Sequence, residues 1–161
     1  MKGEISDNKN ISFKQCDKKD YDLLQEMEGE LIDDENKFTP KKLLEYRNFK
    51  NRDNRPSKSD IENDIKNSKF ILYDNKICGF FRLDLDLKSK PKQAELNFLY
   101  IKKGFRGEGI GNFTISSIIN YCKELNIKLI TLGVSSKNEN AFNLYKKHGF
   151  NEYHKSMFIK I

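Results

Sequence analysis

The chain has 161 residues, with 30 Lys and Arg against 24 Asp and Glu and a formal net charge of +6. Its length suits one compact domain, so we expect residues 1–161 to form a single domain. Hydrophobic residues make up 37% and aromatic residues 12%, enough for a core, which excludes wholesale disorder. No apolar run approaches a membrane helix, and residues 1–10 are too polar for a signal peptide. We therefore expect a cytoplasmic protein with no membrane partner.

The cysteines and histidines indicate neither a disulfide framework nor a metal site. Cys16, Cys78 and Cys122 are odd in number, widely spaced and free of any Cys-x-x-Cys pair. The two histidines, His148 and His154, cannot make a metal cage by themselves. We expect no bound metal.

The charge is unevenly divided along the chain. Residues 1–100 carry 20 basic and 20 acidic side chains, whereas residues 101–161 carry 10 basic and 4 acidic ones. Residues 17–35 hold nine acids and two lysines: the acids are Asp17, Asp20, Asp22, Glu26, Glu28, Glu30, Asp33, Asp34 and Glu35. A uniformly basic nucleic-acid binder would not look like this, so we expect no nucleic-acid partner. The pattern suits a molecule that holds an anion at one end and a cation at the other.

Hydrophobic periodicity and turn residues predict short elements in the first half. They are a strand over 11–15, a helix over 21–32, a helix from Pro40 to Tyr46 capped by Thr39, a mobile loop over 48–59, and a helix from Ser59 or Asp60 to about Lys66.

The second half is more regular. It predicts hairpin strands over 69–73 and 77–87, a strand over 94–101, a helix over 109–125, a strand over 129–134, a helix over 138–148 and closing strands over 150–153 and 157–160. The strand over 129–134 is wholly apolar, which predicts a central position with both faces covered. The fold class is α/β (α+β): a mixed, mostly antiparallel sheet of about six to seven strands with helices on both faces.

The stretch between the strand over 94–101 and the following helix carries the clearest chemistry. Gly107, Gly109 and Gly111 leave backbone N–H groups open to a closely approaching ligand. The helix start adds unpaired donors and the positive end of its dipole, which favour phosphate. Arg106 supplies a permanent fork-shaped donor at the same place. Glycine spacing alone leaves a ligand-free turn equally open.

Two other phosphate loops fit poorly. A nucleotide P-loop needs Gly-Lys-Ser/Thr, but Asn112 and Phe113 follow Gly111. A dinucleotide fingerprint needs a third glycine where Thr114 stands, and an acid at the end of the next strand, which ends instead in Ser135-Ser136-Lys137.

The sequence contains two spaced motifs, Arg106-x-x-Gly109-x-Gly111 and Asn138-x-x-Ala141-x-x-x-Tyr145-x-x-x-Gly149-Phe150. Both resemble motifs of the GNAT superfamily of acetyl-CoA-dependent N-acetyltransferases. The match runs over the 57 residues from 94 to 150. The resemblance implies the GNAT fold, with a splayed central strand pair, and acetyl-CoA as cosubstrate.

The resemblance also implies roles for particular residues. Main-chain groups of Leu99, Tyr100 and Ile101 would meet the pantetheine arm near a bulge. The pyrophosphate would be wrapped by Arg106, Gly107, Glu108, Gly109, Ile110 and Gly111. Asn138 would hydrogen-bond the cofactor arm, and Tyr145 would act as general acid beside the sulfur. A helix N-cap remains the alternative for Asn138, and core packing for Tyr145.

A transferase of this kind needs a neutral amine, whereas a lysine-type amine has a pKa of about 10.4. Glu95 lies eleven residues before Arg106, the spacing of the catalytic glutamate in the histone-acetylating branch of the family. We therefore expect Glu95 to be the general base, acting through water. A solvent-facing glutamate, with water alone taking the proton, is the alternative.

The acceptor is left open by the sequence. In the family the first helices form the acceptor wall, so the acidic segment 17–35 favours a cationic primary amine, with a solvated helix face as the alternative. The activity expected is acetyl transfer to a small cationic amine or a peptide amine. The alternative is a protein that binds acetyl-CoA as a sensor without turnover. We expect a monomer or a homodimer.

Overall fold

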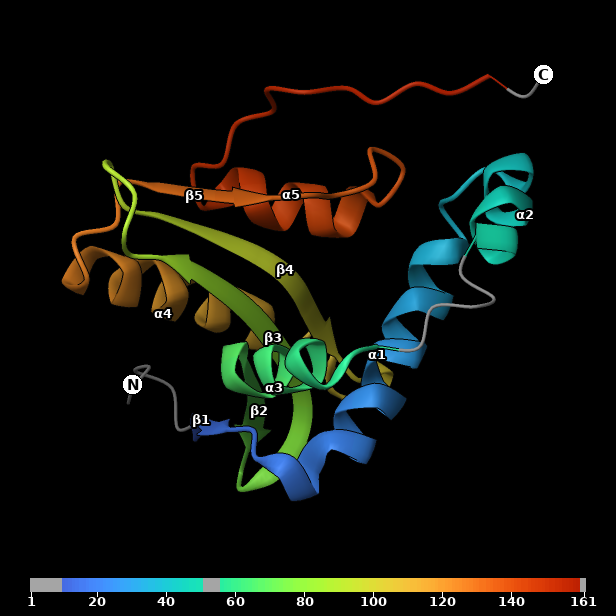
Figure 1. Cartoon of the computed structure of the whole chain (residues 1–161). Helices are drawn as coiled ribbons and strands as arrows, with labels where there is room; N and C mark the ends of the chain where they lie inside the picture. The colour runs from blue at the N-terminus through green and yellow to red at the C-terminus, as the bar shows by residue number, and fades with distance from the viewer. Residues whose placement is uncertain (1–9, 51–55, 160–161) are drawn as a thin grey trace.

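The computed structural model of the chain describes residues 10–50 and 56–159 (Figure 1). The strands are β1 (Ile11–Gln15), β2 (Ser68–Tyr73), β3 (Lys76–Asp86), β4 (Gln93–Ile101) and β5 (Leu129–Leu132). The helices are α1 (Tyr21–Asn36), α2 (Lys41–Lys50), α3 (Lys58–Asn67), α4 (Ile110–Glu124) and α5 (Glu139–Lys147), with 3₁₀ turns η1 (Lys18–Asp20) and η2 (Lys103–Phe105). Within these ranges no helix is both long and apolar enough to cross a membrane.

The five strands form one mixed sheet. They follow the chain in the order β1-β2-β3-β4-β5, antiparallel through β4, and β5 joins β4 in parallel after the α4 crossover. Connections of this kind are typical of a hairpin region followed by a β-α-β unit. The predicted fold class, a mostly antiparallel mixed sheet with helices on both faces, is confirmed.

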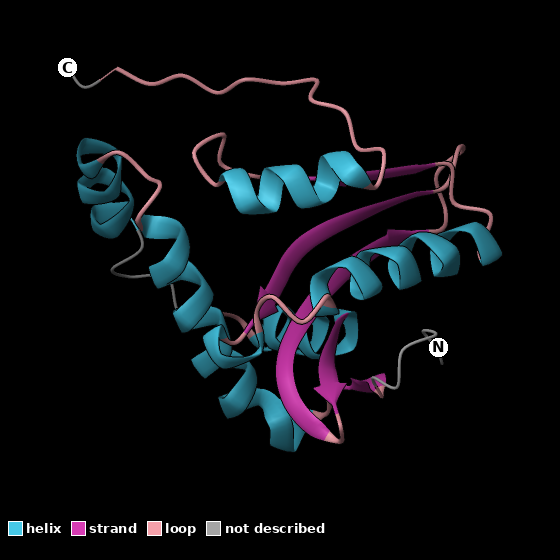
Figure 2. Cartoon of the chain, turned by 180° about the vertical axis from the view of Figure 1, so that it is seen from behind, coloured by secondary structure: helices cyan, strands magenta, loops and turns pink. Residues whose placement is uncertain are grey.

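Helices cover both faces of the sheet, and each face has its own core (Figure 2). On one face α4 buries Ile110, Ile115 and Ile118 against strand residues such as Phe81 and Leu83. On the other face α1 and α3 cover the sheet, with residues that include Leu24, Met27, Ile65, Phe70, Phe80 and Tyr100. The sheet therefore separates two apolar layers, and its strands alternate between them.

The predicted elements form with small shifts at their ends. The helix predicted over 21–32 continues to Asn36, and the hairpin turns at Asp74 and Asn75, both with positive φ. Helices extend into both sides of the loop predicted over 48–59, and residues 51–55 of it lie outside the described residues. The N-cap of α3 is Ser57 and not Ser59 or Asp60, because Ser57 and Asp60 form a capping box.

The prediction for the end of the chain was wrong. Residues 150–153 and 157–159 form no strand, and residue 160 lies outside the described part of the chain. This segment runs clear of the sheet with Tyr153, Met157 and Ile159 exposed (Figures 1 and 2). The described sheet therefore has five strands instead of six to seven.

The central position predicted for β5 was wrong for the same reason. Its only strand partner in the described sheet is β4, so β5 forms the edge, and Leu129 is 48% exposed. An apolar run predicts covered faces, but it does not show how many strands flank the strand, and Leu129 at this edge is not covered.

A buried arginine joins α1 and α3 to the sheet. Arg82 of β3 forms ion pairs with Glu28 of α1 and with Asp64 of α3, the latter at 2.9 Å. Its Nε donates to the Ser68 hydroxyl at 3.1 Å, and its guanidinium lies 4.9 Å from the centre of the Phe98 ring. Burial raises the pKa of both carboxyl groups despite the attraction of Arg82. Two carboxylates and a hydroxyl thus compensate the desolvated guanidinium, and α1 is held at a defined place over β3.

Gly79 provides a test of the packing between β3 and β4. A Cβ at this position would lie 2.1 Å from the carbonyl oxygen of Tyr100, so β4 or β3 would have to move. We expect Gly79→Ala to lower the free energy of unfolding by about 3 kcal/mol. Gly29→Ala is the matched control, because position 29 is on the exposed side of α1, where the Cβ would meet nothing, and the change should stabilise the protein by about 0.5–1 kcal/mol. Urea unfolding measures both, and equal effects would contradict the close approach.

Candidate active site

The loop between β4 and α4 leaves its backbone open. Gly107 and Gly109 have φ of 84° and 79°, and nothing lies within 4 Å of a Cβ built at either position. Gly109 is the N-cap of α4 and provides no side-chain cap, so the first N–H groups of the helix stay available. Glycine is required here for the left-handed backbone, and the open donors at a helix start suit an anion such as pyrophosphate.

The third glycine has a packing role. A Cβ at Gly111 would lie 3.3 Å from Cδ2 of Leu144, because α5 packs closely on the first turn of α4. His148 Nε2 lies 3.2 Å from Asn112 Oδ1 and links the same two helices. The small residue in the motif therefore brings α5, with Tyr145, up to the glycine loop.

β4 parts from β5 directly before this loop. The parallel pairing ends at Leu96 and Leu132. At the same point the register with β3 shifts, so that Asn97 is an extra, bulged residue in β4 between Leu96 and Phe98. Beyond the bulge, β4 stays paired to β3, but its other edge over 98–101 has no strand partner among the described residues.

The splayed strand pair is therefore present, with its bulge at Asn97. The exposed edge includes the three residues predicted to meet the pantetheine arm, Leu99, Tyr100 and Ile101. Main-chain N–H and C=O groups along such an edge accept an extended ligand in the way they accept another strand.

Tyr145 lies beside the splay on α5. Its ring packs edge-on to Phe150 at 5.8 Å between centroids, and it contacts the core on the α4 face. Burial and, second, the nearby Glu35 carboxylate raise the pKa of its hydroxyl to about 12. The core packing that was the alternative for Tyr145 is present, and it holds a protonated phenol near the end of α1.

Asn138 fills the role of a helix cap. Its Oδ1 accepts a hydrogen bond from the Ala141 N–H at 3.2 Å, at the start of α5. A cap leaves the Asn138 amide N–H₂ group able to donate elsewhere.

Glu95 and Tyr145 emerge on opposite faces of the sheet. Ala94 and Leu96 are buried on the α4 face, so the alternation of β4 directs Glu95, which is exposed, to the other face. It lies opposite Asp84 of β3 and Thr131 of β5, before the bulge. The structure does not bring the predicted base and the predicted acid together.

Arg106 is directed at helix α1. Its Nε donates to the carbonyl of Ile101 at 2.8 Å, and its Nη2 donates to Oδ2 of Asp34 at 2.7 Å. The guanidinium also lies 5.5 Å from the centre of the Tyr100 ring. These contacts hold the arginine at the edge of the loop, where part of its fork faces solvent.

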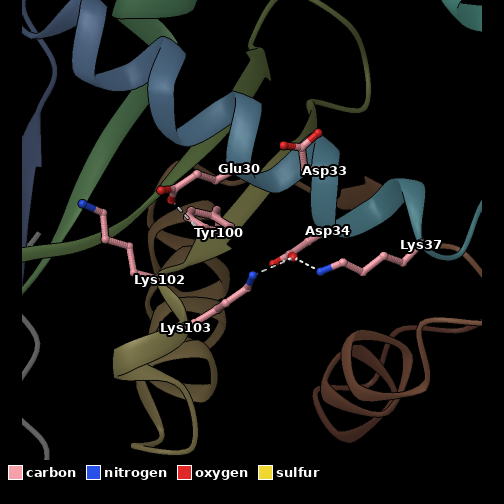
Figure 3. A pocket seen from close by; sticks show the side chains of 7 residues that line it. All are labelled: Glu30, Asp33, Asp34, Lys37, Tyr100, Lys102 and Lys103. Atoms are coloured by element: carbon pink, nitrogen blue, oxygen red, sulfur yellow. Dashed lines mark hydrogen bonds and ion pairs between the residues drawn. The ribbon is translucent and has the colours of Figure 1, made fainter.

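A pocket of about 260 Å³ lies between α1, the end of β4 and η2, lined by Glu30, Asp33, Asp34, Lys37, Tyr100, Lys102 and Lys103 (Figure 3). Tyr100 Oη donates to Glu30 Oε2 at 2.8 Å; burial and then this carboxylate raise the pKa of the phenol to about 12. Two cations beside Asp34 hold the pKa of that carboxyl well below its usual range: Lys37 has the larger effect and Arg106 the next. The acidic segment thus faces a pocket next to the glycine loop.

The three lysines of this pocket were not among the predicted site residues. Lys102 and Lys103 directly precede the motif arginine as a Lys-Lys-x-x-Arg run, a signal that could have been read. Lys37 lies one helical turn after Asp34, the spacing of a helix ion pair.

Comparison with known proteins gives a family. The acetyltransferase (GNAT) family model matches residues 28–150. An uncharacterised N-acetyltransferase of Lactobacillus delbrueckii subsp. lactis is 27% identical over 94 residues, 56% of this chain and 54% of the relative. The chain thus spans about half the length of that curated relative.

Solved structures share the fold at low identity. Arabidopsis thaliana Naa50, in complex with the bisubstrate analogue CoA-Ac-MVNAL, matches with a TM-score of 0.66 and 20% identity over 89% of this chain and 85% of its own. An aminoglycoside acetyltransferase from an uncultured soil metagenomic sample, in complex with sisomicin, matches with a TM-score of 0.61 and 14% identity. The match covers 98% of this chain and 99% of that protein. Because the family model covers well over half of the sequence and the described fold agrees with it, the chain belongs to the acetyltransferase (GNAT) family.

Proposed function

We propose that this protein is an acetyl-CoA-dependent N-acetyltransferase that transfers the acetyl group directly to a primary amine. The observation that carries the proposal is the unpaired edge of β4 over 98–101, which leads into an open glycine loop at the start of α4. The strand edge suits an extended amide arm, and the glycine loop that follows it along the chain suits a pyrophosphate. Acetyl-CoA has both groups.

The residues present suit acetyl-CoA, because the glycine loop and the edge of β4 are both open in the described structure. The edge at Leu99, Tyr100 and Ile101 offers main-chain partners to the amides of the pantetheine arm, apart from the Ile101 carbonyl, which accepts from Arg106. The loop from Arg106 through Glu108 to Gly111, with the N–H of Ile110, offers donors to the pyrophosphate. Acetyl-CoA, when bound, supplies the activated acetyl thioester.

The residues in proposed catalytic roles are Tyr145 and Glu95. Tyr145 keeps its proton to high pH and gives it to the departing thiolate, while donors along the β4 edge polarise the thioester carbonyl. Glu95 takes the proton of the amine. Because Glu95 lies before the bulge at Asn97, whereas the pocket lies at the other end of β4, it acts through ordered water and does not touch the amine directly.

The acceptor we propose is a cationic amine. Glu30, Asp33 and Asp34 face the pocket beside the splayed strand, and their charge favours a cation over an anion. Two structural neighbours were solved with a peptide-bearing analogue and with an aminoglycoside, both amine-type acceptors. Release of CoA thiol would be measured against polyamines, aminoglycosides and basic peptides. CoA binding without release of thiol against any of them would favour the sensor alternative.

Tyr145→Phe tests the general acid. The variant keeps the ring that packs on Phe150 but loses the proton, so we expect kcat to fall on the order of 10²-fold with the KM for acetyl-CoA little changed. Because the pKa of Tyr145 lies at about 12, the parent should show no loss of rate through this group between about pH 7 and pH 10. A variant as fast as the parent would remove Tyr145 from the mechanism.

Glu95→Gln tests the base through the pH dependence of the rate. Near neutral pH the variant should be slower by about 10-fold or more, since nothing removes the amine proton. The deficit should shrink as the pH approaches the amine pKa of about 10.4, where the acceptor is already neutral. Asp86→Asn, on an exposed residue of β3, is the control. A deficit in Glu95→Gln that is constant with pH would contradict a role as base.

Arg106→Glu tests the cofactor loop. Loss of a charge-assisted donor, with reversal of its charge, should raise the Kd for CoA by at least about tenfold in calorimetric titration. Lys18→Glu makes the same charge change on exposed η1, away from the glycine loop, and should leave the Kd near that of the parent. If the two variants bound CoA equally well, the cofactor would not lie at this loop.

A further inference from the structure

The Asp34 carboxylate of α1 forms ion pairs with three cations at the edge of the glycine loop. Asp34 Oδ2 accepts from Nη2 of Arg106 at 2.7 Å, and its Oδ1 lies 2.5 Å from Nζ of Lys37 and 3.6 Å from Nζ of Lys103 (Figure 3 shows the two lysines). The contact between Asp34 and Arg106 joins residues 72 apart in sequence. An anion supplied by the chain itself therefore lies against the cations of the loop.

Two of these cations belong to the site proposed for pyrophosphate. Arg106 opens the glycine motif, and Lys103 lies in η2 directly before it. Both bind the same carboxylate, so a pyrophosphate that approaches them meets charges that are already partly neutralised. The third cation, Lys37, is the C-cap of α1 and lies one turn beyond Asp34.

We propose that Asp34 is an internal counter-ion of the cofactor site, which the pyrophosphate of CoA displaces from Arg106 and Lys103. The inference rests on the proposed function, because it requires that the glycine loop binds this cofactor. In the free protein Asp34 joins α1 to the loop, and in the complex it keeps Lys37 as its partner.

Replacing Asp34 by a pyrophosphate at Arg106 and Lys103 costs little free energy, because both cations are exposed to solvent. The side chains of Arg106 and Lys103 are 45% and 70% exposed, and ion pairs at such exposed positions contribute little to stability. The Asp34 side chain is 15% exposed and would be costly to leave alone, but its pair with Lys37 is on the same helix and does not depend on the loop. Arg106 also keeps its bond to the Ile101 carbonyl, so it stays at the site.

The exchange also connects the two proposed ligand sites. Asp34 lines the pocket together with Glu30 and Asp33, where we propose that the cationic acceptor binds. Once Arg106 and Lys103 turn to the pyrophosphate, two of the positive charges beside Asp34 are neutralised, and the pocket becomes more negative. Cofactor binding would thereby prepare the acidic side of the site for a cation.

Calorimetric titration with CoA tests the proposal. Asp34→Asn removes the competing charge but keeps the shape of the side chain, so CoA should bind about threefold to tenfold more tightly than to the parent. Asp33→Asn removes a charge from the same pocket without an ion pair to these cations in the described structure, and should change the Kd by less than about twofold. A thermal unfolding midpoint equal to that of the parent shows that each variant is folded.

Two further measurements assign the gain to the contact. Pantetheine lacks the pyrophosphate, so Asp34→Asn should leave its binding unchanged. In a background with both Arg106→Ala and Lys103→Ala, Asp34→Asn should no longer tighten CoA binding, since the displaced partners are absent.

The outcomes separate this proposal from the proposed function. If Arg106→Ala alone left CoA binding unchanged, the cofactor loop would be misplaced and both proposals would fail. If Arg106→Ala weakened CoA binding but Asp34→Asn did not strengthen it, only the counter-ion would be overturned. Equal tightening by Asp33→Asn and Asp34→Asn would also overturn it, because the effect would then come from net charge and not from the contact.

Discussion

The site depends on one backbone constraint: β4 pairs with β3 along its whole length, but with β5 only over its first four residues, 93–96. The bulge at Asn97 comes directly after Leu96, the last residue of β4 that pairs with β5, and from there the strand keeps one neighbour. Backbone N–H and C=O groups on the free edge need partners, and water or an extended ligand can provide them. The glycine loop follows this edge directly, and α4 starts at Ile110, so both halves of a long anionic ligand meet donors in the order of the chain.

A second interaction decides what lies over that edge. Buried Arg82 requires two carboxylates, and they come from α1 and α3, so both helices are held to the same face of β3. The rest of α1 then extends from Glu28 past Tyr100 toward the loop, where Asp34 reaches Arg106. The acidic segment is thus only partly a solvated surface. Several of its carboxylates are used inside the protein, and others line the pocket beside the splayed strand.

Much of the fold could be predicted from local signals, because periodicity, capping residues and turn residues act over a few positions. The hairpin at Asp74 and Asn75 and the helix that starts after Gly109 are examples. The lack of closing strands and the edge position of β5 could not be predicted from the sequence, since strand pairing depends on which segments meet in space. The partner of Arg106 was missed for the same reason: Asp34 is 72 residues away, and a charge pattern does not identify its partner.

The sequence by itself determined the family motifs, the glycine positions and the residue types available to the chemistry, because these depend on identity and spacing along the chain. The tertiary structure decided their use. It placed Glu95 and Tyr145 on opposite faces of the sheet, since β4 alternates while α5 packs on the α4 side. It also changed the meaning of the +6 charge with which the composition begins: the basic residues around the loop are opposed by a carboxylate from the acidic segment, because folding brings the two ends of the charge distribution into contact.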